Sequence, residues 1–160
     1  MELPSGLGMR PQRDSDNAFL AKLYPSTRED LRMIDAERGF VEELIELQFL
    51  AQRDGYGRQF PNAFYFIVEY RNEPVGRAAV DFGQNEVRLM DIAFMPAARN
   101  RGYGESVIRA LQIAAKKVAA PLTLSVLTSN HGAFRLYENL GFRVEERSQT
   151  HALMAWYPRP

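Results

Sequence analysis

The chain has 160 residues, 46% of them hydrophobic and 25% charged, and its 20 lysine and arginine residues balance its 20 aspartate and glutamate residues. This size and composition predict one globular domain over residues 1–160, and the neutral balance gives no support to nucleic acid or an acidic membrane surface as a partner. The chain has no cysteine and two histidines. We therefore exclude disulfides and thiolate nucleophiles, and we expect no metal site.

The first part of the sequence predicts a short strand followed by helices. MELPSGLGMRPQ lacks the apolar core of a signal peptide, and no apolar run reaches membrane-spanning length, so we expect a cytoplasmic protein with no membrane partner. We expect residues 1–8 to be loose and a strand over residues 9–12. In DSDNAFLAKLY, Asp14 or Asp16 is a candidate N-cap, and helical spacing continues through PSTREDLRMI and FVEELIELQFLAQRDGYG to a stop near Gly55.

The sequence from residue 64 onward changes to strand-forming residues. AFYFIVEY, VGRAAVDF and EVRLMDIAFM are separated by the turns RNEP and GQN, which predicts an antiparallel meander over residues 64–95. A helix over residues 102–119 then leads to the strand PLTLSVLT, and a helical crossover implies that the strands it joins are parallel. The remaining elements are a short helix capped by Asn130 and ended by Gly141, and strands near residues 142–147 and 151–157. This order predicts an α+β fold on a mixed sheet.

The stretch RNRGYGESVIRALQ, residues 99–112, places glycine and arginine directly before a helix. Gly102 and Gly104 allow a tight turn and a close approach of a ligand to the backbone, and the N–H groups at a helix start can cradle a phosphate. Arg99 and Arg101 add charged donors. A dinucleotide-binding fingerprint would need a third glycine where Val107 stands, and a P-loop would need Gly-Lys-Ser/Thr. By itself, such a stretch is more often a plain turn.

A second motif lies shortly downstream, N-x-x-A-x-x-L-Y-x-x-x-G-F over residues 130–142. With both motifs the sequence resembles the GNAT superfamily of acyl-CoA-dependent N-acyltransferases. Arg99, Gly102 and Gly104 match the signature Q/R-x-x-G-x-G/A of that superfamily, and LMDIAFMP is similar to its bulged fourth strand. The resemblance is specific over residues 87–142. It implies a GNAT-like mixed, mostly antiparallel central sheet flanked by helices, with splayed parallel strands forming the acyl-CoA cleft.

The resemblance implies acetyl-CoA as the co-substrate and assigns residues to it. Backbone N–H groups before and within the start of the helix would surround the pyrophosphate of CoA. The fourth strand would offer backbone groups to pantetheine, and the N–H near Phe94 would face the thioester oxygen. Asn130 would contact the cofactor's arm where the two parallel strands splay. The implied cofactor-binding residues are Ile92, Ala93, Phe94, Arg99, Asn100, Arg101, Gly102, Tyr103, Gly104, Glu105 and Asn130.

The catalytic residues are less completely defined by the resemblance. Tyr137 stands where many members place the general acid, and a tyrosine with an ordinary pKa of about 10 is protonated at neutral pH and can donate to the departing thiolate. Some members use a glutamate base on the fourth or fifth strand, but here Arg88 and Ser125 occupy the matching positions. Glu86 and Asp91 lie nearby, and we name them as candidate bases, acting directly or through water.

The sequence therefore predicts an N-acetyltransferase that moves an acetyl group from acetyl-CoA to a primary amine by direct attack in a ternary complex. An alternative of a different class is a catalytically silent CoA-binding sensor or partner module. A third is a nucleotide-binding regulator that uses the same helix N-terminus for another phosphate. The sequence leaves open whether the acceptor is a small molecule or a peptide or protein amine, how long the acyl group is, and whether the protein is a monomer or a homodimer.

Overall fold

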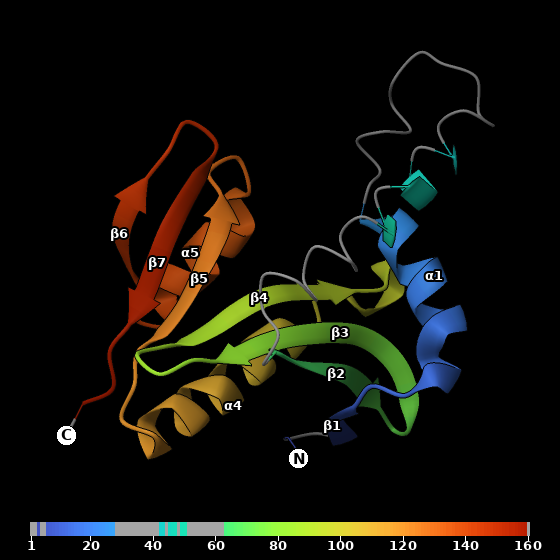
Figure 1. Cartoon of the computed structure of the whole chain (residues 1–160), viewed down its shortest axis with the longest axis horizontal. Helices are drawn as coiled ribbons and strands as arrows, with labels where there is room; N and C mark the ends of the chain where they lie inside the picture. Colours follow the sequence, from blue (N-terminus) through green and yellow to red (C-terminus); the bar gives the residue numbers. More distant parts are fainter. Residues whose placement is uncertain are drawn as a thin grey trace.

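The structure, a computed structural model, describes residue 3 and residues 6–27, 42–43, 45–47, 49–50 and 63–159. Over these residues the chain forms a seven-stranded sheet in the order β1-β2-β3-β4-β5-β7-β6 (Figure 1). Neighbouring strands pair antiparallel except β4 and β5, which are parallel. This confirms the predicted mixed, mostly antiparallel sheet. The strands are β1 (Leu7–Pro11), β2 (Ala63–Tyr70), β3 (Glu73–Phe82), β4 (Val87–Phe94), β5 (Leu122–Leu127), β6 (Arg143–Arg147) and β7 (His151–Trp156).

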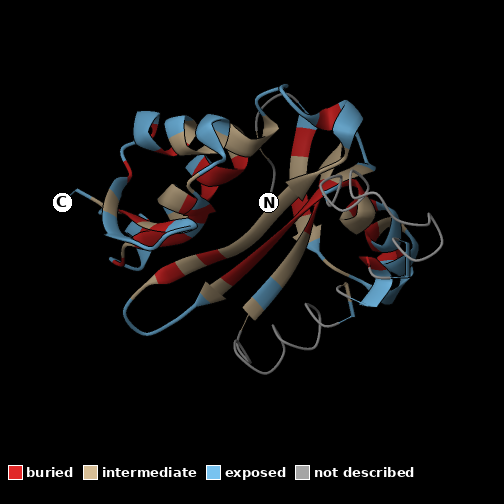
Figure 2. Ribbon diagram, turned by 90° about the horizontal axis from the view of Figure 1, so that it is seen from above, coloured by how far each residue is buried: buried red, intermediate tan, exposed pale blue. Residues whose placement is uncertain are grey.

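Helices pack on both faces of this sheet. Side chains of α4 and α5 belong to the main core cluster, whereas Leu20 and Leu23 of α1 pack with Ile67 in a second cluster on the opposite face. Figure 2 shows that buried residues concentrate in the sheet and that the outer sides of the helices are exposed. Residues 42–43, 45–47 and 49–50 are helical, and the rest of the predicted helical stretch up to Gly55 lies outside the described residues. The helices are α1 (Asn17–Ser26), α4 (Tyr103–Lys117) and α5 (His131–Asn139), with 3-10 turns η2 (Asp14–Asp16) and η3 (Pro96–Ala98).

Two predictions near the N-terminus need correction. The first strand begins at Leu7, inside the segment expected to be loose, because Leu7 pairs with Tyr70 and its side chain is buried in the core. Asp16 precedes α1, but its side chain makes no capping hydrogen bond to that helix. The carboxylate is instead held by Arg10 and by the backbone N–H of Arg13, so a charged partner has displaced the cap.

Strand β4 contains one extra residue relative to β3. Asp91 lies opposite Ala79 and Leu89 lies opposite Val80, so Met90 has no partner and forms a β-bulge. Because side chains alternate along a strand, one extra residue reverses which face the following residues occupy. Val87 and Leu89 before the bulge, and Ile92 and Phe94 after it, all join the core under α4. Asp91 and Ala93 consequently face the side of the sheet that carries α1.

The bulge also marks the point where β4 leaves β5. The two strands pair only from Val87↔Leu122 to Leu89↔Leu124, although β4 continues to Phe94 and β5 to Leu127. Figure 1 shows β5 turning away from β4 together with β7 and β6. The predicted pair of splayed parallel strands is therefore present, and it leaves one backbone edge of β4 without a strand partner beyond Leu89 among the described residues.

Gly76 on β3 permits the close packing of the end of β4. A Cβ atom at Gly76 would lie 2.5 Å from the carbonyl oxygen of Ala93 and 2.5 Å from the ring of Phe94. Both distances are far below a normal carbon contact, and one of the two neighbours is backbone, which cannot rotate away. Any other residue at this position would therefore push the end of β4 off β3.

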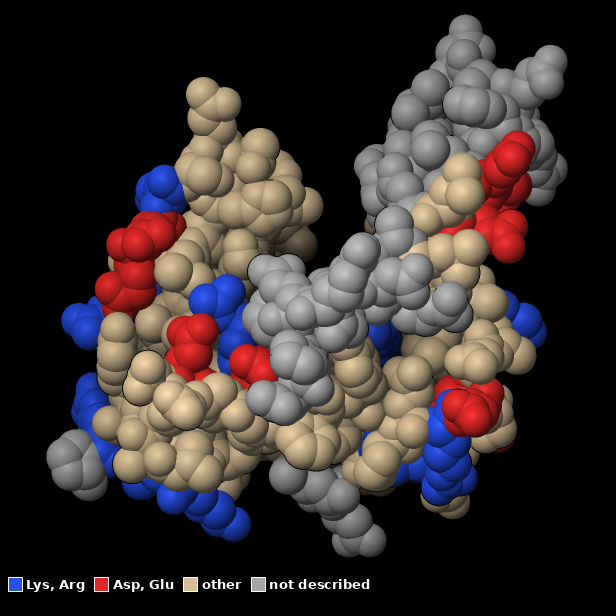
Figure 3. Space-filling model, viewed as in Figure 1, with Lys and Arg blue, Asp and Glu red and all other residues tan. Residues whose placement is uncertain are grey.

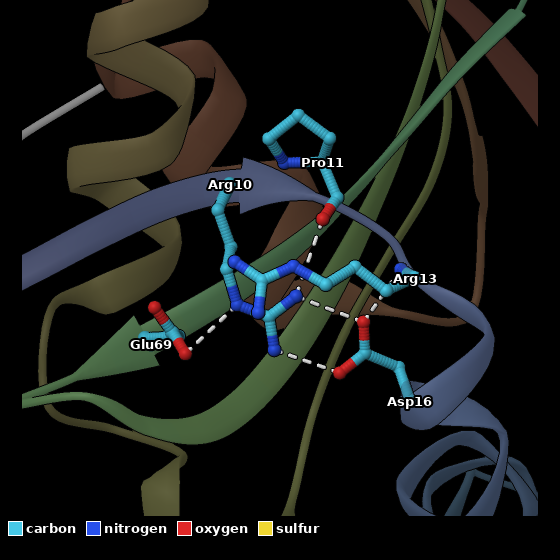
Figure 4. A network of polar contacts seen from close by, with 5 residues as sticks. All are labelled: Arg10, Pro11, Arg13, Asp16 and Glu69. Carbon is cyan, nitrogen blue, oxygen red and sulfur yellow. Dashed lines mark hydrogen bonds and ion pairs between the residues drawn. The ribbon is translucent and has the colours of Figure 1, made fainter.

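A partly buried ionic network connects β1 and η2 to β2 (Figure 4). The guanidinium of Arg10 donates to both carboxylate oxygens of Asp16, at 2.8 and 2.7 Å, and to Glu69 of β2 at 2.9 Å. The side chain of Asp16 is only 6% exposed. The hydrogen bond from Arg10 lowers the pKa of Asp16 from its ordinary 3.8 to about 2. This carboxylate therefore stabilises the fold above its ordinary pKa, and the contribution is lost as the pH falls from about 4 through 2.

We expect Asp16→Asn to reduce the free energy of unfolding near pH 7 by about 2 kcal/mol, the equivalent of the pKa shift. Urea denaturation at a series of pH values measures this, and the variant should lose less stability than the wild type between about pH 5 and pH 2. Asp14→Asn is the matched control, because Asp14 is an exposed residue of the same turn, and its effect should stay within about 0.5 kcal/mol. Equal effects of the two substitutions would contradict this account.

Candidate active site

The open edge of β4 presents backbone groups that face away from β3. The N–H of Met95 donates to the carbonyl of Val75 at 2.8 Å, so Met95 faces β3. Backbone groups of successive strand residues point to opposite sides, and those of Phe94 and Ile92 therefore face the side that β5 has left. The carbonyl of Phe94 accepts a hydrogen bond from Arg99 at 3.1 Å. The N–H of Phe94 is consequently the donor that this edge offers.

The loop after β4 brings the N-terminus of α4 beside the end of that strand. Asn100 and Gly102 both adopt left-handed backbone conformations, with φ of +60° and +79°, which turns the chain sharply into the helix. The N–H of Ser106 bonds to the carbonyl of Gly102 at 3.1 Å, so the N–H groups that precede it in the first turn have no helical partner. A Cβ atom at Gly104 would lie 3.7 Å from the ring of Phe94. The bare start of the helix and the open edge of β4 are therefore neighbours.

The two arginines of this loop bind protein carbonyls. Arg99 donates to the carbonyls of Phe94 and Ser26, both at 3.1 Å, and thereby connects the end of β4 to the end of α1. Arg101 donates to the carbonyl of Ala97 at 2.9 Å. Each guanidinium has further N–H donors, so these bonds position the arginines without using all their capacity. The sequence predicted positive charge at this loop, but it could not predict that the side chains of Arg99 and Arg101 also hold the loop in place by hydrogen bonds.

Tyr137 and Asp91 come from distant parts of the sequence and interact electrostatically. Tyr137 on α5 is 8% exposed and packs against Phe142, and no group among the described residues hydrogen-bonds to its hydroxyl. Burial raises the pKa of Tyr137, and the negative charge of Asp91 raises it further. Burial also raises the pKa of Asp91, while the positive charge of Arg77 and the N–H of Ile92 lower it. The tyrosine is therefore held in its protonated form, which is the form that can donate a proton.

Glu86, the other candidate base, belongs to a separate network. Its carboxylate accepts hydrogen bonds from Thr123 at 2.9 Å and from Arg88 at 3.2 Å, and Arg88 also donates to the hydroxyl of Thr123 at 2.8 Å. Arg88 and Thr123 are directly paired across β4 and β5. The network therefore joins the two strands just before they separate, and Glu86 is already engaged there.

The remaining predicted residues fall around the open edge or beside it. The side chain of Asn130 caps α5 by accepting from the N–H of Ala133 at 3.2 Å, as predicted for this position. Glu105 in the first turn of α4 pairs with Arg109 at 3.0 Å. The rings of Tyr103 and Tyr70 stack with centroids 5.4 Å apart. Ile92 and Phe94 present backbone groups at the open edge, whereas the backbone of Ala93, between them, pairs with Arg77 of β3.

Sequence reasoning missed Arg77 of β3. This arginine is 8% exposed, and its Nη1 atom lies 3.9 Å from Oδ2 of Asp91. It is the one charged residue in the otherwise apolar run VGRAAV. A lone charge in such a run was the feature of the sequence that could have identified Arg77. Figure 3 shows positive and negative side chains interspersed over the face it displays.

The family model of the acetyltransferase (GNAT) family matches residues 22–142. The chain belongs to this family, whose co-substrate is acetyl-CoA. A curated relative from Bacillus subtilis (strain 168), a putative [ribosomal protein bS18]-alanine N-acetyltransferase, is 30% identical over 84 residues. That match covers 52% of this chain and only 56% of the relative, so it extends over about half of the relative's length.

Solved structures share the whole fold at low sequence identity. The PaiA N-acetyltransferase from Thermoplasma acidophilum, in complex with coenzyme A, has a TM-score of 0.71 at 16% identity and covers 94% of this chain and 98% of its own. The ribosomal-protein-S18-alanine N-acetyltransferase from Escherichia coli has a TM-score of 0.68 at 16% identity, covering 96% and 95%. A GNAT acetyltransferase from Elizabethkingia anophelis with acetyl-CoA bound has a TM-score of 0.64 at 15% identity, covering 95% and 98%. In the part of the present chain that the structure describes, no helix is both long and apolar enough to cross a membrane.

Proposed function

We propose that this protein is an N-acetyltransferase that transfers the acetyl group of acetyl-CoA to a primary amine by direct attack in a ternary complex. The observation that carries the proposal is the open edge of β4 lying beside the bare N-terminus of α4. One extended ligand that combines an amide-bearing arm with a pyrophosphate suits both features at once. CoA is such a ligand, and it would lie between β4 and β5 where their pairing ends.

Each part of the cofactor has a chemically suitable group in this arrangement. The pyrophosphate would accept hydrogen bonds from the unpaired N–H groups at the start of α4, where the helix dipole also favours negative charge. The pantetheine arm would pair with the backbone of Ile92 and Phe94, and Asn130 would contact it from the side of β5. The residues proposed around the pyrophosphate are Arg99, Asn100, Arg101, Gly102, Tyr103, Gly104 and Glu105.

The chemical step needs an oxyanion donor and a proton donor. The neutral amine attacks the thioester carbonyl, and the N–H of Phe94 stabilises the oxyanion that forms. The carbon–sulfur bond then breaks, and Tyr137 gives its proton to the departing thiolate of CoA. The products are the acetylated amine and CoA. Support for Tyr137 comes from its hydroxyl, which has no hydrogen-bond partner in the part of the chain that the structure describes, and from burial, which raises its pKa and keeps it protonated.

We assign the base to Asp91 in preference to Glu86. An alkylammonium must lose a proton before it attacks, and a carboxylate whose pKa is raised by burial accepts a proton better than an ordinary one. Asp91 also acts electrostatically on Tyr137, which supports roles for both residues in one site. Relatives described above are named as N-acetyltransferases that act on the alanine of a ribosomal protein. The amines to be tested as acceptors therefore include an N-terminal α-amine, together with lysine side chains, polyamines and small metabolites.

The first test is a thermal-shift titration with acetyl-CoA and CoA, with ATP and NAD as controls. Acetyl-CoA at about a hundred times its Kd should stabilise the protein by about 2.7 kcal/mol, and ATP and NAD should not. Gly104→Asp should abolish the shift, because it places negative charge where the pyrophosphate would lie. Gly104→Ala should keep it, since the added methyl group meets only the ring of Phe94 at normal contact distance. An undiminished shift in Gly104→Asp would refute the assignment of this loop.

Tyr137→Phe should lower kcat by roughly a hundredfold or more while leaving the acetyl-CoA thermal shift unchanged, because only the transferable proton is removed. Release of CoA, measured with a thiol reagent over the amine panel, gives the rate. Wild-type protein that binds acetyl-CoA but acetylates no amine would instead favour the non-catalytic CoA-binding module. An unaltered kcat in the variant would remove Tyr137 from the mechanism.

Asp91→Asn should lower kcat/KM by roughly a hundredfold and remove the acid limb of the pH profile. A base works only when deprotonated, so the wild-type rate should fall as the pH drops through the pKa of Asp91, which burial places above the ordinary 3.8. Glu86→Gln is the comparison, and we expect a smaller loss because that carboxylate is held by Arg88 and Thr123. A larger loss with Glu86→Gln would transfer the assignment to Glu86.

A further inference from the structure

Arg77 carries a buried positive charge with unused hydrogen-bond donors. Its side chain is 10% exposed, and its Nε atom is buried without any partner. The nearest carboxylate oxygen, Oδ2 of Asp91, is 3.9 Å from Nη1, which is an ion-pair distance and too long for a hydrogen bond. The guanidinium also lies over the ring of Tyr65, at 5.3 Å from the centroid. No hydrogen bond of this guanidinium occurs among the described residues.

A buried arginine with unsatisfied hydrogen-bond donors indicates a place where a ligand binds. Buried polar groups in folded proteins are almost always hydrogen-bonded, and an unsatisfied charged donor is more costly than a neutral one. The stacking on Tyr65 and the loose ion pair with Asp91 compensate the charge but leave the planar N–H groups unfilled. A group that brings an oxygen acceptor to Arg77 would remove this cost.

Arg77 lines a cavity of about 100 Å³ between α1 and the strands β3 and β4. The charged residues Arg77 and Asp91 and the hydroxyl-bearing residues Tyr24 and Thr27 form its polar lining, and apolar residues complete it. A volume of this size is equivalent to roughly three water molecules, so it fits a small organic group only. The cavity lies on the face of the sheet to which the bulge turns Asp91, opposite the face covered by α4. Its apolar wall is formed by Leu20, Leu23, Phe49 and Ala93.

We propose that this cavity is the acceptor subsite and that it selects an α-amino acyl group with a small side chain. The ammonium lies against Asp91, the oxygen of the adjoining carbonyl or carboxylate accepts from Arg77, and the side chain packs against Leu20 and Leu23. Because the two charged groups are 3.9 Å apart, one ligand must present an amine and an oxygen within a few bonds. An α-amino acyl unit does so, whereas the amine of a lysine side chain or a polyamine is flanked by methylene groups. This inference rests on the proposed function and adds the acceptor class to it.

The assignment makes Arg77 a specificity-determining residue. Its hydrogen bond would orient the acceptor so that the amine faces Asp91, and Asp91 in turn lies close enough to Tyr137 to alter its pKa. An amine without the neighbouring oxygen would leave Arg77 unsatisfied and would lack this orientation. Discrimination against such amines therefore comes from a missing hydrogen bond to a buried charged donor, which is an effective basis for selectivity.

The test compares acceptors that differ in the oxygen. Wild-type kcat/KM is measured for alaninamide, free alanine, 2-aminobutane and Nα-acetyllysinamide, and calorimetry measures binding of each to the enzyme–CoA complex. We expect alaninamide or alanine to exceed the other two amines by roughly 10- to 100-fold in both readouts. The ratio of alaninamide to alanine shows whether an amide carbonyl, as in a peptide, or a free carboxylate is the natural source. Phenylalaninamide should be poorer than alaninamide, because the cavity is small.

Arg77→Met and Arg77→Lys should both reduce the ratio of kcat/KM for the preferred α-amino acyl acceptor to that for 2-aminobutane by roughly 10-fold or more. The lysine variant retains the charge but loses the planar donors, so it decides the matter even if the methionine variant fails to fold. Arg143→Met is the matched control, because Arg143 also lies over a tyrosine ring, that of Tyr157 at 5.6 Å, but is exposed. The control should keep the wild-type ratio.

The inference is overturned if wild-type protein handles alaninamide, alanine and 2-aminobutane equally well, or if the Arg77 variants keep the wild-type ratio. Either result leaves the proposed function intact, since acetyl transfer to some amine would still be observed. If no amine is acetylated and acetyl-CoA gives no thermal shift, the proposed function fails. In the case of binding without turnover, the calorimetric comparison of alaninamide, alanine and 2-aminobutane still decides for or against the subsite.

Discussion

The single extra residue at Met90 determines the geometry on which the rest of the site depends. Before the bulge, β4 pairs with β5 and places Val87 and Leu89 in the core under α4. After the bulge, pairing with β5 has ended and the same core is filled by Ile92 and Phe94. In an unbulged strand Asp91 would face that core, where a carboxylate without a partner is strongly disfavoured. The bulge therefore accompanies an open backbone edge on the side of β5 and turns a carboxylate toward the cavity beside α1.

The elements around this edge are held by side chains that also carry charge. Arg99 binds carbonyls at the ends of β4 and α1, and the network of Glu86, Arg88 and Thr123 connects β4 to β5 just before they separate. The absence of a side chain at Gly76 lets Phe94 lie directly on β3. These contacts rigidify the strand ends, and a rigid edge is what allows fixed N–H groups to stabilise a developing charge without reorganisation.

The charged groups near the site differ in how completely they are satisfied. Arg10 is bonded to two carboxylates and serves the fold, because it connects β1, η2 and β2 through filled hydrogen bonds. Arg77 is more deeply buried, its Nε has no hydrogen-bond partner among the described residues, and it lines a cavity. These two arginines thus have opposite hydrogen-bond status. The hydrogen bonds of Arg10 give it a structural role, whereas the unsatisfied donors of Arg77 indicate a ligand.

The order and type of the elements from residue 63 onward, and the location of the loop before α4, could be predicted from the sequence, because they depend on local periodicity, turn residues and glycine. The sequence also indicated the family, since both motifs are contiguous. Asp16 occupies the N-cap position of α1, as one of the two predicted candidates, but its carboxylate binds Arg10 and the N–H of Arg13 and does not cap the helix. Sequence reasoning assigned no role to Arg77. Its expectation that residues 1–8 are loose failed at Leu7, whose pairing partner Tyr70 lies 63 positions further along the chain. The ion pair of Asp91 with Arg77 and the electrostatic effect of Asp91 on Tyr137 could not be predicted from the sequence, because both depend on a one-residue bulge and on packing between elements far apart in the chain.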